Sequence, residues 1–191
     1  LGEDPGYVRP ASQSDSITSV TQQFGQGMTA TSAQVVSLYQ TIGNGGVRMP
    51  LTLVEGCEQP DGTFVPAPEP TGTRVVSEHA ADTTLHILEN VVTNYHIGSQ
   101  LAVPGYRIAA KTGTAEVASG NGYGSERIVS IAGVFPADNP KYAIDVTFAK
   151  PVSMRTSAAA APTFNAIVKQ VIKTFDIPPS TEPAPTIPLT W

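Results

Sequence analysis

Apolar residues recur at helical spacing in three stretches of the chain, and the first of these stretches follows residue 31. Thr31 and Gln34 have the spacing of a capping box, in which side chains satisfy free backbone amides at the start of a helix. The apolar positions that follow are Val35, Val36, Leu38, Tyr39 and Ile42. The Gly-rich run at 43–46 then favours a helix end. We therefore predict a helix of about three turns after Thr31.

The same period predicts two further helices. Ser77 is a good N-cap for the second helix, whose apolar residues keep helical spacing to about Asn94. The third helix runs from about Pro162 to Phe175. Its apolar face consists of Phe164, Ile167, Val168, Val171, Ile172 and Phe175. Because such a one-sided helix needs a partner for that face, we expect it to pack across one side of a sheet.

Three segments have the pattern of strands, at 105–113, 128–135 and 141–149. The last two are joined by the tight polar turn PADNP (136–140), so they are expected to pair antiparallel. The first is followed by a Gly- and Ser-rich segment at 116–127, which we expect to be a flexible loop that overhangs a site. Helices packed on an antiparallel sheet define a mixed α+β fold.

Two segments lie outside this pattern. Residues 51–56 and 63–68 flank the turn sequence CEQPDG, which favours a short two-stranded hairpin. The chain ends in a Pro-rich segment, which is expected to be disordered or extended. We therefore assign residues 1–176 to one folded domain and residues 177–191 to a disordered tail.

Composition narrows the range of functions. The chain has 191 residues, 40% hydrophobic and 14% charged, which suits one domain with a core. A net charge of -5 with 11 Lys and Arg argues against a nucleic-acid partner. No apolar run approaches the roughly 20 residues of a membrane-spanning helix, and no signal-peptide pattern is present. Because the chain begins at Leu1 rather than Met, we interpret it as a fragment of a longer protein.

Residues 111–117 read KTGTAEV and directly follow the run GYRIAA at 105–110. An ordinary strand end, closed by a turn and a solvated charge, is one interpretation of this segment, and an active-site edge is the other. The alternation expected of a strand places Arg107, Ala109 and Lys111 on one face, and Tyr106, Ile108 and Ala110 on the other.

Three sequence blocks carry a resemblance to a known family. They are FGQGMTATSAQ…YQTIGNGGVRMP, VPGYRIAAKTGTAE and IAGVFPADNPKYAIDVTFAKP. Their order, followed by a C-terminal helix, resembles the C-terminal half of the transpeptidase domain of class B penicillin-binding proteins. K-T-G belongs to the signature set of that family, together with S-x-x-K and S-x-N. Within the family, the chain most resembles the division-type enzymes, especially actinobacterial ones.

The resemblance implies a peptidoglycan D,D-transpeptidase that works through a serine acyl-enzyme, is inhibited covalently by β-lactams and needs no cofactor. It assigns catalytic roles to Lys111 and Thr114 and substrate binding to Thr112, Gly113 and Thr114. The amide of Thr114 would stabilise the oxyanion, and Gly113 would admit the substrate backbone. The hydroxyls of Thr112 and Thr114 would bind the terminal carboxylate of the substrate, while Lys111 would hydrogen-bond the serine of S-x-N.

The chain departs from the family pattern in two ways. S-x-x-K is absent, and the single S-x-N match, Ser119-Gly120-Asn121, follows K-T-G, whereas the family's motif precedes it. We therefore expect the nucleophile, its lysine and the middle motif on a segment before Leu1, so that this chain alone cannot be acylated. Residues 150–162 also stand where many division-type relatives carry an aromatic and a Gly pair that wall the active site.

The resemblance also implies partners and a location. The partners are stem peptides ending in D-Ala-D-Ala, β-lactams, the N-terminal part of the same protein, divisome proteins and a glycosyltransferase. The location is outside the cytoplasm, with a membrane anchor on an N-terminal segment. Two alternatives stay open: a non-catalytic penicillin-binding or scaffold module, and a serine β-lactamase, which the long excursion at 46–70 suits poorly. An S-x-x-K motif upstream of this chain would favour the enzyme.

Other candidate sites are weaker. His79 and His86 are seven positions apart on the second predicted helix, about 10.5 Å along its axis, which is too far to share one metal ion. His96 has no partner at ligand spacing, and Cys57 is the one cysteine, so no metal site is predicted. Tyr123 either leans over the site from the expected loop or is an ordinary loop aromatic.

Overall fold

The structure is a computed structural model that describes residues 4–120 and 122–187. Its helices are α1 (Ser16–Gln22), α2 (Ser32–Gly43), α3 (Glu78–Asn94), α4 (Gly98–Leu101) and α5 (Ala161–Thr174), with short 3-10 turns η1 (Ala11–Gln13) and η2 (Ser157–Ala159). Its strands are β1 (Tyr7–Val8), β2 (Met28–Thr29), β3 (Val47–Arg48), β4 (Gly56–Glu58), β5 (Phe64–Pro66), β6 (Thr73–Arg74), β7 (Ala109–Ser119), β8 (Gly122–Phe135) and β9 (Tyr142–Ala149). Leu1, Asn121 of the Ser-Gly-Asn match and residues 188–191 of the predicted tail lie outside the described residues.

The centre of the fold is a sheet in the order β7-β8-β9. Both pairs of neighbours are antiparallel, which confirms the predicted arrangement of three consecutive strands. The predicted start of the first strand was wrong, because β7 begins at Ala109 and not at residue 105. Gly105 has a φ of 82° and forms a turn after Pro104, so the chain reaches the sheet only four residues later.

The expected flexible loop at 116–127 is instead the far end of the β7–β8 hairpin. β7 continues to Ser119 and β8 begins at Gly122. Glu116 lies opposite Arg127, and their side chains form an ion pair of 2.8 Å across the two strands. The prediction was wrong because local composition does not show cross-strand pairs, which hold a Gly- and Ser-rich segment extended.

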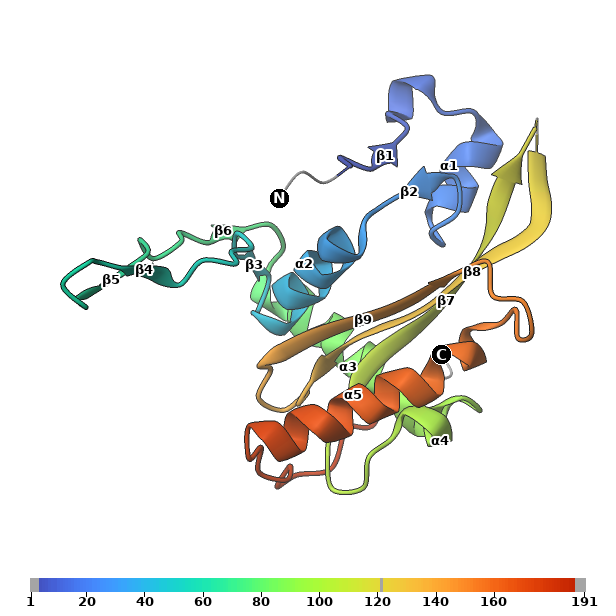
Figure 1. The fold of residues 1–191 in the computed structure, drawn as a ribbon. Coiled ribbons are helices and arrows are strands. Elements are labelled where there is room, and N and C mark those ends of the chain that lie inside the picture. Colours follow the sequence, from blue (N-terminus) through green and yellow to red (C-terminus); the bar gives the residue numbers. More distant parts are fainter. Residues whose placement is uncertain (1–3, 121, 188–191) are drawn as a thin grey trace.

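Helices cover both faces of the sheet (Figure 1). On one face α5 buries Phe164 and Val168 in a core that also contains Ile131 of β8. This confirms that the third helix packs on the sheet, and its bounds differ by one residue at each end from those predicted. Ile167 and Phe175, which were predicted to belong to its packed face, are exposed, because that face is narrower than the apolar pattern indicated. On the other face Leu85 and Leu88 of α3 pack with Ala109, Val134 and Ala137, and Tyr39 and Ile42 of α2 lie against this second core.

The two other predicted helices begin at the predicted caps. The Thr31 side chain accepts a hydrogen bond from the Gln34 amide at 3.2 Å, and the Gln34 side chain accepts one from the Thr31 amide at 2.9 Å. The capping box is therefore complete. At the start of α3, Ser77 accepts a hydrogen bond from the Ala80 amide at 3.2 Å. Polar caps thus position both helices that lie against the second face of the sheet.

The end of α2 depends on two glycines in the left-handed region, with φ of 58° at Gly45 and 88° at Gly46. A Cβ at Gly46 would lie 2.4 Å from the carbonyl oxygen of Val76, whereas a Cβ at Gly45 would meet only the Glu78 side chain, at 3.8 Å. Gly45→Ala is therefore expected to lower the free energy of unfolding by about 1–2 kcal/mol, because alanine is strained in the left-handed region. Gly46→Ala is expected to lower it clearly more, because its Cβ would also clash with Val76. Equal unfolding midpoints in urea for the two variants would contradict this expectation.

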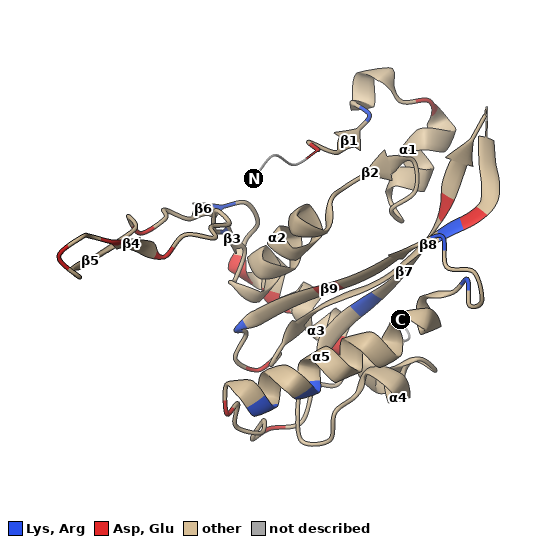
Figure 2. Cartoon of the chain, in the orientation of Figure 1, with Lys and Arg blue, Asp and Glu red and all other residues tan. Residues whose placement is uncertain are grey.

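Residues between α2 and α3 form an arm that extends away from the sheet (Figure 1). β4 pairs antiparallel with β5, which confirms the predicted hairpin around CEQPDG. β3 pairs with β6 at the base of the arm. Figure 2 shows only acidic charges along the outer arm, and these residues are Glu55, Glu58, Asp61 and Glu69. Cys57 is exposed on β4.

The segment before α2 was not predicted to contain regular structure, but it forms β1, η1, α1 and β2. β1 pairs with β2, and α1 lies between them in the chain, beside the tip of the β7–β8 hairpin (Figure 1). Gln26 Nε2 donates a hydrogen bond of 3.2 Å to the carbonyl oxygen of Glu116 on β7. Because Ile17 and Phe24 are exposed, this segment has an apolar surface without a partner among the described residues.

The Pro-rich tail contains no helix or strand as far as the structure describes it, to residue 187. Its first residues are held against the turn that precedes β7. Ile177 is buried, and its carbonyl oxygen accepts a hydrogen bond of 2.9 Å from the hydroxyl of Tyr106. The amide of Ser180 donates to the carbonyl oxygen of Gly105, also at 2.9 Å. These contacts join the first residues of the tail to the segment that precedes β7, at the end of the strand opposite the hairpin tip.

Candidate active-site edge

The K-T-G-T segment lies on an edge strand. Lys111, Thr112, Gly113 and Thr114 are consecutive in β7, and β8 is the only strand that pairs with β7 among the described residues. Beside Lys111–Thr114, the opposite side of β7 has no strand partner among the described residues and can bind an added chain, because alternate residues of an edge strand turn their amide and carbonyl groups away from the sheet. Thr112 and Thr114 are two positions apart, so their side chains point to the same face of the sheet.

The predicted alternation of faces before and within β7 is confirmed. Ile108 and Ala110 belong to the core under α5, and Ala109 belongs to the core under α3. Arg107, on the same face as Ala109, is bonded to Glu89 of α3. Lys111 continues this series, so its side chain leaves the sheet on the face that α2 and α3 cover.

Lys111 is exposed and forms no ion pair within residues 4–120 and 122–187. Its Nζ donates a hydrogen bond of 2.8 Å to the carbonyl oxygen of Thr112 and lies 3.4 Å from the Thr112 hydroxyl. Both acceptors belong to its own strand. The ammonium group can therefore turn to another acceptor without breaking a contact between elements.

Gly113 lies close to a side chain of the neighbouring strand, a contact that the sequence did not reveal. A Cβ at this position would lie 2.5 Å from the hydroxyl oxygen of Ser130, which is directly opposite Gly113 on β8. The missing side chain thus makes room for Ser130 on the face of the sheet. The family resemblance implied a different role for Gly113, which is to leave room for the substrate backbone, and the two roles are compatible.

Asp145, a half-buried residue, shares the cross-strand row of Lys111. Lys111 pairs with Ala132, and Ala132 pairs with Asp145 on β9. Oδ1 of Asp145 is buried without a hydrogen-bond partner among the described residues, while Oδ2 accepts a hydrogen bond of 2.9 Å from Thr147. Burial, together with the charge of Asp145, raises the pKa of Tyr39 on α2 to about 12. Tyr39 is therefore neutral at physiological pH.

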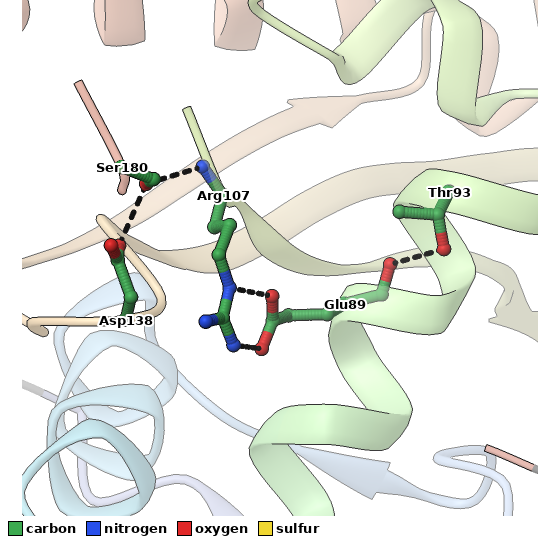
Figure 3. Close-up of polar contacts among 5 residues, drawn as sticks. All are labelled: Glu89, Thr93, Arg107, Asp138 and Ser180. Carbon is green, nitrogen blue, oxygen red and sulfur yellow. Dashed lines mark hydrogen bonds and ion pairs between the residues drawn. The ribbon is translucent and has the colours of Figure 1, made fainter. Parts of the chain in front are cut away.

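An ion pair just before β7, between Arg107 and Glu89, was not predicted from the sequence (Figure 3). Arg107 Nε donates to Glu89 Oε2 at 2.7 Å, and Arg107 Nη2 donates to Glu89 Oε1 at 2.7 Å. The sequence feature that could have indicated this pair is Glu89, a charged residue within the apolar stripe of α3. That stripe is formed by Leu85, Leu88 and Val92. A charge in such a stripe indicates a buried partner, because an unpaired buried carboxylate is costly.

A cavity of about 750 Å³ lies beside this ion pair and not beside Lys111. Glu89 and Arg107 line it, and so do His96 and residues 180–184 of the tail. None of Lys111, Thr112 and Gly113 lines this cavity.

The remaining candidate positions contribute little. Tyr123 lies on β8 opposite Ala118, so it is a strand residue and not a loop residue. His79 and His86 lie on α3, and the described residues contain no group of three or more His, Cys, Asp and Glu side chains arranged to hold a metal ion. In the same part of the chain, no helix has the length and apolar character needed to cross a membrane.

Comparison with known proteins gives a consistent result. The family described as "Penicillin binding protein transpeptidase domain" matches residues 1–169. The chain is 33% identical over 200 residues to penicillin-binding protein PbpB of Mycolicibacterium smegmatis, covering 98% of this chain and 31% of PbpB. It is 35% identical over 182 residues to peptidoglycan D,D-transpeptidase FtsI of Escherichia coli, covering 94% of this chain and 29% of FtsI. The chain thus spans about a third of the length of these curated relatives.

Solved structures agree with this result. A peptidoglycan synthetase of Bifidobacterium adolescentis superposes with a TM-score of 0.88 and 31% identity, over 100% of this chain and 35% of that chain. Penicillin-binding protein 3 of Mycobacterium tuberculosis, complexed with ampicillin, superposes with a TM-score of 0.84 and 34% identity, over 96% of this chain and 43% of that chain. Both likenesses include the sheet and the helices on its two faces.

Proposed function

The chain belongs to the penicillin-binding protein transpeptidase family, and we propose that it forms the K-T-G wall of the active site of a division-type peptidoglycan D,D-transpeptidase. The observation that carries this proposal is the position of K-T-G-T on the free edge of β7, with an exposed Lys111 that has no ion-pair partner among the described residues. If the segment were only the end of a strand, no function would follow from this arrangement.

The proposed reaction is acyl transfer. A serine attacks the carbonyl carbon of the penultimate D-Ala of a stem peptide, the terminal D-Ala leaves, and the amine of a neighbouring stem peptide then attacks the acyl-enzyme. The serine, with the S-x-x-K and S-x-N motifs, would come from a part of the protein outside this chain, since the chain contains no S-x-x-K. A β-lactam would acylate the same serine.

The edge of β7 would contribute two interactions with the substrate backbone. The amide of Thr114 would donate a hydrogen bond to the oxygen that becomes negative in the tetrahedral intermediate, which is where a fixed donor accelerates acyl transfer most. Neighbouring groups on the same edge would align the extended stem peptide as an added strand. Gly113, between the two threonines, would let that backbone approach closely.

The side chains of the segment would contribute charge and specificity. The hydroxyls of Thr112 and Thr114 would bind the C-terminal carboxylate of the stem peptide, to which the charge of Lys111 is also attracted. Lys111 would turn from its present acceptor on Thr112 to the serine of the S-x-N motif and support proton transfer there. No cofactor or metal ion enters this scheme.

Partners and location follow from the same proposal. The ligands are stem peptides ending in D-Ala-D-Ala and β-lactams, and the structure of the mycobacterial relative with ampicillin supports the second class. The N-terminal part of the same protein would complete the site, with divisome proteins and a glycosyltransferase as further partners. An enzyme of this kind works outside the cytoplasm, with its anchor on an N-terminal segment.

A labelling experiment tests the proposal. The intact protein is expected to form a stable adduct with a fluorescent penicillin, and peptide mass mapping should place it on a serine of an S-x-x-K motif outside residues 1–191. The isolated chain should not be labelled. An adduct on a serine of this chain, or the absence of any adduct, would contradict the transpeptidase assignment, and rapid release of hydrolysed penicillin would favour a β-lactamase.

A further inference from the structure

We propose that Glu89 and Arg107 are positioning residues for the K-T-G edge: their ion pair holds β7 at a set place and angle against α3. The inference rests on the proposed function, because it assumes that Lys111 and Thr114 act on the substrate. Neither residue touches K-T-G itself. Arg107 precedes Lys111 by four positions, which corresponds to about 13 Å of extended chain.

The geometry of the pair is that of a fork, with two parallel hydrogen bonds of 2.7 Å each from Arg107 Nε and Nη2 to the two oxygens of Glu89. The Glu89 side chain is 1% exposed and that of Arg107 is 14% exposed. Two bonds fix the direction as well as the distance between the side chains, which one point charge does not. The hydrogen bonds that Arg107 donates to Glu89 also raise the pKa of Arg107.

Arg107 is held at its main chain as well as at its side chain (Figure 3). Its amide donates a hydrogen bond of 3.0 Å to the Ser180 hydroxyl, which in turn donates one of 2.8 Å to Asp138 Oδ1. Its carbonyl oxygen accepts a hydrogen bond of 2.9 Å from the amide of Ala137. Arg107 therefore joins α3, the tail and the β8–β9 turn at one point.

This point matters because β7 has a strand neighbour on one side only. A central strand is held by ladders on both sides, whereas the free side of β7 must stay open for the substrate in the proposed function. Contacts before the K-T-G segment therefore help to set its distance from α3, among them the apolar contact of Ala109 and the pair of Arg107 with Glu89. A displacement of about 1 Å at a catalytic group can cost about 100-fold in rate.

A merely structural role is the competing explanation, and an apolar replacement separates the two. Buried ion pairs exchanged for apolar residues of similar volume often retain or gain stability, whereas removal of one partner leaves an unpaired buried charge. The double variant Glu89→Leu/Arg107→Met is therefore expected to fold, although it lacks the fork. Glu89→Gln should show a lower melting temperature than the double variant.

The test measures acylation of the intact protein by a fluorescent penicillin together with its melting temperature. In the double variant, the acylation rate constant at saturating penicillin is expected to fall by about 10- to 100-fold, with the apparent dissociation constant changed less than threefold, as a shifted catalytic edge requires. Arg107→Lys, which keeps the cation without the fork, should fold and show a smaller loss of the same rate constant. The proposal would be overturned if the folded double variant had the acylation rate constant of the wild type. If only Arg107→Lys folds, the same result in that variant would overturn it.

Two further variants complete the design. Glu116→Ala breaks an exposed ion pair with Arg127 on the other side of K-T-G and serves as the matched control, with acylation expected to stay within about twofold. Lys111→Ala is measured in parallel. If Lys111→Ala leaves acylation intact, the proposed function and this inference both fail. If it slows acylation while the double variant does not, the inference alone fails.

Discussion

Replacement of Lys111 by alanine is expected to slow β-lactam acylation of the intact protein by about two to four orders of magnitude, the scale associated with loss of a preorganised donor or proton-transfer partner. Folding should survive, because Lys111 is exposed and bonds only to Thr112 within the described residues. The stability cost should not exceed about 1 kcal/mol, as for ordinary surface substitutions. The measurement is the second-order acylation rate by a fluorescent penicillin, with the melting temperature taken on the same sample.

Lys173→Ala is the matched control, because Lys173 is an exposed lysine in the last turn of α5, on another element. Its acylation rate should equal that of the wild type. Thr114→Pro would delete the amide proposed as the oxyanion donor and should also impair acylation, although it disturbs the backbone. An unchanged rate in a folded Lys111→Ala protein would reduce K-T-G to a strand segment without a chemical role.

The second large effect concerns stability. Phe164→Ala is expected to destabilise the domain by about 3–5 kcal/mol, the range for removal of a large aromatic side chain from a core. Phe164 is 0% exposed and lies between α5 and the sheet, together with Ile131 and Val168. Its loss would leave a cavity that these β-strand and helix side chains can fill only in part. Calorimetry of the intact protein should show a lower melting temperature for the unfolding transition of this domain.

Ile167→Ala provides the comparison on the same helix. Ile167 is 36% exposed, so its truncation removes much less buried surface and should cost about 1 kcal/mol or less. Because both substitutions leave alanine on α5, helix propensity changes little between them. Similar losses of stability for the two variants would show that α5 does not pack on the sheet through Phe164.

Much of the fold was accessible from local patterns. Thr31 with Gln34, and Ser77, predicted the starts of α2 and α3, because an N-cap is a contact between residues three positions apart. The PADNP turn predicted the pairing of β8 with β9 for the same reason. The segment at 116–127 was misread as a loop because its extended form depends on contacts across the hairpin, such as Glu116 with Arg127.

The sequence by itself determined the family resemblance, the α+β class and the place of K-T-G in a strand, since each depends on residue order and short-range periodicity. Only the tertiary structure decided that β7 is an edge strand, that Gly113 faces Ser130, and that Arg107 is bonded to Glu89 from eighteen positions away. These facts depend on which distant residues the folded chain brings together. A buried charge such as Glu89 indicates that a partner exists, but the packing of α3 on the sheet selects which residue it is.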